Sequence, residues 1–110
     1  MILRDVPEWT WVSYRGNPCF LKYKNAREAY LIDCNKKNYI ASVEDYIEPI
    51  KVPKFDKDDT VLCINKKAPC HNQILTITSI RTFGMCSKYA PYKIGDDFWA
   101  MPFDIQKLNY

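Results

Sequence analysis

The chain has 110 residues, and its 16 lysine and arginine residues outnumber its 13 acidic residues, which gives a net charge of +3. A hydrophobic content of 47% is high enough to form a core, which excludes a disordered chain. No apolar run approaches the ~20 residues that cross a bilayer, and the start of the chain lacks the apolar segment of an export signal, so we expect a cytoplasmic protein without membrane contact.

Strand signals dominate the first half of the chain, and helical periodicity is nearly absent. Runs rich in aromatic and β-branched residues predict strands at 9–15, 19–24, 28–34 and 39–42. A short turn or one 3₁₀ turn is expected at 43–47, followed by an extended piece at 48–50. Pro49 and Pro53 disfavour both helix and central strand, so 51–54 is predicted to be a linker.

The second half is predicted to repeat this series of short strands and turns. Strands are predicted at 59–64, 73–83, 98–101 and 105–108. Turns are expected at 65–69, 95–97 and 102–104, and the tyrosine-rich segment 85–94 is expected to be irregular.

The two halves resemble each other. The segment 39–47 can be laid on 98–106, which brings Ala41 onto Ala100 and Asp45 onto Asp104. Each half also has a proline–cysteine pair after its first strand, at 18–19 and 69–70. These coincidences predict one repeat of about 55 residues that is used twice.

Five short strands per half, with a 3₁₀-like turn before the last, resemble an SH3-like barrel of the bacterial and phage type. The segment 39–50 is similar to the end of such barrels, where a final strand closes the sheet, and 55–64 is similar to their opening. The resemblance implies an all-β protein of two tandem SH3-like barrels of about 50 residues each, at 1–50 and 55–110. The opening motif of signalling SH3 domains is missing, so proline-rich peptide binding is not expected.

Catalytic and metal-binding residues are sparse in this sequence. His71 is the one histidine, and the three glycines are isolated, so we predict neither an enzyme nor a cofactor. Free thiols are the expectation for the five cysteines in a reducing cytoplasm. Zinc bound by Cys63, Cys70, His71 and Cys86 is the alternative, but the spacing is unlike that of structural zinc sites, so no metal is predicted.

The excess of aromatic residues is the remaining signal. Small phage proteins of similar composition often bind and inhibit a host factor, and the sequence predicts a protein-binding adaptor or inhibitor with an unidentified protein partner. The alternative is nucleic-acid binding through an aromatic and basic face. Lys22 and Lys24 would share one strand face, as would Trp9 and Trp11, which form either a platform or part of the core. The candidate contact residues are Trp9, Trp11, Lys22, Lys24, Tyr89, Tyr92 and Trp99, and 85–92 is the expected recognition loop.

Overall fold

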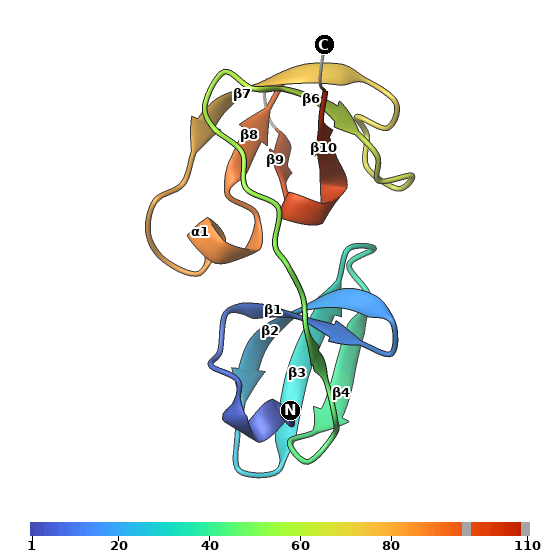
Figure 1. The fold of residues 1–110 in the computed structure, drawn as a ribbon, viewed down its shortest axis with the longest axis vertical. Coiled ribbons are helices and arrows are strands. Elements are labelled where there is room, and N and C mark those ends of the chain that lie inside the picture. The colour runs from blue at the N-terminus through green and yellow to red at the C-terminus, as the bar shows by residue number, and fades with distance from the viewer. Residues whose placement is uncertain (96–97, 109–110) are drawn as a thin grey trace. The chain divides into compact units, whose positions relative to one another are not determined.

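The computed structural model describes residues 1–95 and 98–108, so the turn expected at 95–97 lies largely outside the described residues. Two compact units make up the chain, Met1–Lys51 and Val52–Tyr110. Each contains one five-stranded antiparallel sheet, and the fold class is all-β as the sequence predicts (Figure 1). Among the described residues, no helix combines the length and the apolar character needed to cross a membrane.

The first unit contains a short 3₁₀ helix, η1, and five strands. Their bounds are η1 Leu3–Asp5, β1 Thr10–Tyr14, β2 Asn17–Lys24, β3 Glu28–Asp33, β4 Asn38–Ser42 and β5 Glu48–Pro49. The sheet order is β4-β3-β2-β1-β5, so the last strand pairs with the first. The segment expected to be a short turn or one 3₁₀ turn, 43–47, contains a turn without a 3₁₀ helix, and the 3₁₀ helix of this unit lies near its beginning.

The second unit has the same strand order, β10-β6-β7-β8-β9. Its elements are β6 Thr60–Cys63, β7 Ile74–Ile80, α1 Cys86–Tyr89, β8 Tyr92–Ile94, β9 Phe98–Ala100, η2 Pro102–Asp104 and β10 Ile105–Lys107. The 3₁₀ helix η2 precedes the closing strand, as expected. The segment 85–94 is more regular than predicted, because it contains both α1 and β8.

Each unit buries one face of its sheet in a core of its own. Val12, Leu21 and Leu31 are buried in the first core, and Val61, Ile77 and Ile94 are buried in the second. They come from the first three strands of each sheet. Alternation along the strands explains this, because every second side chain points to the same face.

Both units share a β-bulge at the same place. In β2 the register with β3 shifts between Leu21 and Tyr23, and in β7 the register with β8 shifts between Ile77 and Ser79. Leu21 pairs with Leu31 just as Ile77 pairs with Ile94, so the bulges occupy equivalent positions. A bulge bends and twists a strand, which helps a small sheet to curl.

A left-handed residue precedes the first strand of each unit. Trp9 has φ 67° and Asp58 has φ 73°. The N–H of Trp9 donates to the carbonyl of Leu21 at 2.6 Å, and the N–H of Asp58 donates to that of Ile77 at 2.8 Å. Aspartate tolerates this conformation, whereas a bulky tryptophan there is strained. The hydrogen bond that the two units share therefore holds Trp9 in the left-handed conformation. As a result β1 begins at Thr10 and not at residue 9.

The aspartates matched in the sequence make the same hydrogen bond. One carboxylate oxygen of Asp45 accepts the N–H of Ser42 at 3.2 Å, and one of Asp104 accepts the N–H of Met101 at 2.9 Å. Each aspartate also donates its own N–H to the carbonyl of that same partner residue, at 3.0 Å in both cases. The turn before the closing strand is therefore built in the same way twice.

Candidate functional site

As in the connection between the first and second strands, the second unit is longer than the first in the connection between its second and third strands. In the first unit Lys24 pairs with Ala29, and residues 25–28 connect them. In the second unit the equivalent pair is Ile80 and Tyr92, and the longer segment 81–91 connects them. In Figure 1 this segment is the orange excursion that carries α1. We call residues 81–91 the inserted loop.

The base of the inserted loop is held in two ways. The N–H of Arg81 donates to the carbonyl of Pro91 at 2.9 Å, which joins the two ends of the loop. The guanidinium carbon of Arg81 lies 3.8 Å from the ring centroid of Trp99 on β9, a cation–π contact. Trp99 is half-buried, so it supports the loop from the neighbouring strand.

Hydrogen bonds also order the loop's interior. Gly84 takes the left-handed conformation at φ 82°, and its carbonyl accepts both the hydroxyl of Ser87 at 2.6 Å and the N–H of Ser87 at 3.1 Å. The N–H of Tyr89 donates to the carbonyl of Met85 at 3.0 Å, which closes the helical turn. These internal hydrogen bonds therefore give the loop a defined conformation.

One apolar side chain of this loop is almost fully exposed. Phe83 is 88% exposed, more than any other large hydrophobic residue in the described parts of the chain, and Met85 is 37% exposed. The loop contains Arg81 and Lys88 but no carboxylate. Burying Phe83 against a partner would remove apolar surface from water, and an acidic partner would meet the two cations.

Tyr89 and Tyr92 have separate roles in the structure. Tyr89 ends α1 and is half-buried. Tyr92 is 6% exposed, its ring packs edge-on against Phe55 at 5.2 Å, and its hydroxyl accepts the N–H of Phe55 at 3.2 Å. Tyr92, predicted as a contact residue, therefore belongs to the core.

Trp9 and Trp11 do not form a platform. Trp11 is 4% exposed and packs against Phe20 with ring centroids 5.4 Å apart. Trp9 is 46% exposed but lies outside the strand, in the left-handed position described above. Trp11 is therefore buried, but it lies outside the core cluster to which Val12 and Tyr14 belong, and of these two tryptophans Trp9 is the one exposed to solvent.

The predicted basic face of Lys22 and Lys24 is not formed, because the bulge in β2 falls at Lys22 and breaks the alternation. Lys22 is exposed. Lys24 pairs with the buried Ala29, and its ammonium donates to the carbonyls of Arg4 at 2.6 Å and Val6 at 2.5 Å. Lys24 therefore ties the N-terminal segment to the sheet.

The cysteines are only partly free, contrary to the sequence-based expectation. Cys63 and Cys70 form a disulfide across the connection between β6 and β7, while Cys19, Cys34 and Cys86 are not in a disulfide. Such a bridge between buried cysteines could not be inferred from the odd cysteine count. Among the described residues, no three histidine, cysteine or acidic side chains lie close enough together to hold a metal ion.

Hydrogen bonds to the Asp33 side chain stabilise the turn between β3 and β4. The Asp33 carboxylate accepts the N–H groups of Asn35 and Lys37 at 2.8 and 2.9 Å and the hydroxyl of Tyr39 at 3.0 Å. Burial raises the pKa of Asp33, but these hydrogen bonds outweigh burial and leave it lower than its ordinary value. Burial and the nearby Asp33 raise the pKa of the Cys19 thiol to about 11, so that thiol is a poor nucleophile.

Comparison of the chain with known protein families, with curated proteins and with solved structures finds no match.

Proposed function

We propose that the protein is a non-catalytic protein-binding module that occludes a surface of its partner through the inserted loop. The observation that supports this proposal is the exposure of Phe83 on a hydrogen-bonded loop. Large aromatic side chains in such positions act as anchors in protein interfaces. The partner surface would offer an apolar pocket for Phe83 with acidic residues around it, because the loop carries only cations.

We further propose that the protein is a small inhibitor or adaptor of phage origin that acts on a host factor in the cytoplasm. The support is compositional, and it rests on the resemblance to small phage proteins described above. A reducing cytoplasm would keep Cys63 and Cys70 as thiols. The redox state of this pair in protein isolated under acid quench would therefore report the compartment.

The test places a photo-crosslinking amino acid, p-benzoylphenylalanine, at Phe83. The matched control carries it at Ile74, which is 58% exposed on β7 of the same unit. We expect one discrete protein adduct in bacterial lysate from position 83 and none from position 74. Phe83→Ala should weaken binding of the crosslinked protein by about 30-fold, or about 2 kcal/mol, without changing stability.

Two results would refute this function. One is the same set of adducts from both positions, which would mean that the loop has no preference. The other is a nucleic-acid adduct at position 83, with an affinity that falls steeply between low and moderate salt. The second result would support the alternative function of nucleic-acid binding.

A further inference from the structure

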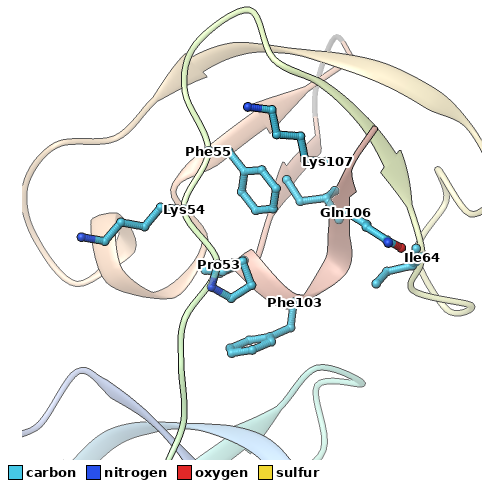
Figure 2. A pocket seen from close by; sticks show the side chains of 9 residues that line it. Pro53, Lys54, Phe55, Ile64, Phe103, Gln106 and Lys107 are labelled. Carbon is cyan, nitrogen blue, oxygen red and sulfur yellow. The ribbon is translucent and has the colours of Figure 1, made fainter. Parts of the chain in front are cut away.

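The pocket beside β10 in the second unit has apolar walls that already form part of the core. Figure 2 shows the side chains that line it, and two of them, Phe55 and Ile105, are 8% and 2% exposed. Both belong to the core cluster of this unit, so a partner would find little of their surface to cover. The first unit, in contrast, exposes large apolar side chains on its sheet.

An exposed row of side chains crosses three neighbouring strands of the first unit. Tyr23 on β2 pairs with Tyr30 on β3, and Tyr30 pairs with Ile40 on β4. Paired residues lie on the same face of a sheet, and Tyr30 stands between Ala29 and Leu31, whose side chains are buried in the core. The row therefore lies on the face that is turned away from the core. We call Tyr23, Tyr30 and Ile40 the outer row.

The outer row presents apolar surface to water. Tyr23 is 55% exposed and Ile40 is 65% exposed, while Tyr30 between them is half-buried. The two tyrosine rings have centroids 5.7 Å apart and planes inclined by 36°, so they form one contiguous surface. Adjacent exposed apolar side chains of this kind are typical of an interaction site.

The second unit has different residues at the equivalent positions. After the same bulge, Ser79 pairs with Lys93, and Lys93 pairs with Trp99. Trp99 is half-buried and stacks with the guanidinium of Arg81. A sheet of this order therefore forms with a serine and a lysine in place of the two tyrosines, so the fold does not account for the exposed apolar row.

Two charges of opposite sign lie beside the outer row on the same face. Lys22 is the extra residue of the bulge, and because Leu21 before it points into the core, Lys22 points outward beside Tyr23. Glu28 lies two residues before Tyr30 on β3, so it shares this face. Both charged side chains are exposed, and neither forms an ion pair with another described residue.

This arrangement is complementary to itself. Glu28 lies on the side of the row nearer the 25–28 connection, and Lys22 lies on the opposite side. In a two-fold symmetric contact each surface meets a rotated copy of itself. An axis that lies in the plane of the face and passes through Tyr30 brings Lys22 of each copy to Glu28 of the other, and the apolar rows then cover each other. Single-stranded nucleic acid also stacks on exposed tyrosines, but Glu28 would repel its phosphates.

We propose that the protein forms a two-fold symmetric dimer through the outer row of its first unit. Tyr23, Tyr30 and Ile40 bury apolar surface against the same residues of a second copy, and Lys22 pairs with Glu28 at two symmetric places. The row is small compared with the ~20–30 residues a side of a stable interface, so the dimer dissociates reversibly at micromolar concentrations. It shares no residue with the inserted loop, so a failure of the loop to bind a partner would leave this proposal intact.

Sedimentation equilibrium of the full chain, from low micromolar to submillimolar concentration, measures the association. We expect a concentration-dependent equilibrium between monomer and dimer. Tyr23→Ser and Tyr30→Lys introduce the residues that the second unit has at these positions, so each should keep its circular dichroism spectrum and weaken the dimer by about tenfold or more. The matched control is Ile74→Ser, at an exposed isoleucine on β7 of the second unit, and it should dimerise like the unmodified chain.

The paired charges give a second readout, which depends on the symmetry of the contact. Lys22→Glu and Glu28→Lys should each weaken the dimer by about tenfold, because like charges then meet at both symmetric places. An equimolar mixture of the two variants should associate like the unmodified chain, because opposite charges face each other at both places of the mixed dimer. The double variant, which has the net charge of the unmodified chain, should dimerise as well.

Three results would overturn the proposal: a monomer at every concentration, a dimer that Tyr30→Lys leaves unchanged, or a mixture of the two charge variants that stays monomeric. Binding of a single-stranded oligonucleotide by a monomeric chain, if lost in both tyrosine variants, would also overturn it, because the outer row would then be a nucleic-acid site.

Discussion

The paired aspartates allow one stability prediction with an internal control. Asp104 is 1% exposed and accepts two hydrogen bonds, from the N–H of Met101 at 2.9 Å and from the side-chain amide of Asn65 at 2.7 Å. Asp45 is half-buried, and its longer contacts are with the N–H of Ser42 at 3.2 Å and a more distant tyrosine hydroxyl. Substitution by alanine removes the acceptor in both cases, but only at Asp104 does it leave a buried donor, the N–H of Met101, without its acceptor.

The expected costs follow from that difference in burial. A hydrogen bond to a charged group contributes about 1.5–3 kcal/mol when its loss leaves a buried donor unpaired, so Asp104→Ala should cost about 3–4 kcal/mol. Asp45→Ala should cost about 1 kcal/mol, because water can replace the carboxylate there. A unit of this size has a total stability of only about 3–9 kcal/mol, so Asp104→Ala should bring the second unit close to unfolding.

Urea unfolding followed by two-dimensional NMR separates the units, because resonances of each can be tracked independently. The second unit should lose most of its stability in Asp104→Ala, and the first should be unaffected. Asp104→Asn, which retains an acceptor, should recover part of the loss. Equal costs for the two alanine variants, or a cost below about 1 kcal/mol at Asp104, would refute the role assigned to burial.

Three further substitutions test other parts of the structure. Replacing Cys63 and Cys70 by serine should lower the free energy of unfolding by about 2–3 kcal/mol, the chain-entropy value for so short a loop, and reduction of the unmodified chain should produce the same drop in urea midpoint. Lys24→Met should cost about 1–2 kcal/mol in thermal unfolding because backbone carbonyls lose their donor, whereas Lys22→Met should be neutral. The pKa of Asp33 is lower in the fold than its ordinary value of 3.8, so its carboxylate stabilises the fold above the unfolded pKa, and that contribution is lost as pH falls through the folded pKa. Stability measured against pH should therefore fall less steeply below about pH 4 in Asp33→Asn, and an unchanged acid limb would contradict the hydrogen-bond pattern.

Sequence reasoning succeeded where the signal was local and repeated. The match of Asp45 with Asp104 identified a turn that the structure builds twice with the same hydrogen bonds. The match of proline–cysteine pairs was coincidental, since Cys19 lies within β2 whereas Cys70 lies in the connection before β7. A matched dipeptide does not establish which positions of the two units are equivalent, whereas a matched side chain that caps its own turn does.

The features that the sequence analysis did not predict depend on departures from regular strand geometry, which the alternation of apolar and polar residues does not reveal. The bulge at Lys22 reverses the face on which every later residue of β2 lies, so Lys24 turns to the core side and away from the predicted basic face. Phe83 was read as the end of a long strand, because Gly84 was the first visible break. The strand in fact ends at Ile80, where the equivalent strand of the first unit also ends, and only the repeat could have revealed this from the sequence.

The shorter equivalent connection in the first unit predicts that the inserted loop is dispensable for folding. Residues 25–28 close the equivalent connection in the first unit, and the side-chain oxygen of Asn25 accepts the N–H groups of Arg27 and Glu28, each at 2.8 Å. Replacing 81–91 by Asn-Ala-Arg-Glu would join Ile80 to Tyr92 across the same pairing geometry. The second unit of this variant should therefore still fold.

The energy terms of this replacement offset one another in part. Shortening the loop gains about 1 kcal/mol of closure entropy, and losing the contact of Arg81 with Trp99 costs about the same. Losing the buried Ala90 and Pro91 leaves a net cost of about 2 kcal/mol, which a stable unit can tolerate. We expect dispersed amide resonances for Val61 and Ile94 together with complete loss of the adduct partner. An unfolded second unit would show that the loop is part of the scaffold, and a folded unit that still binds would show that function lies elsewhere on the sheet.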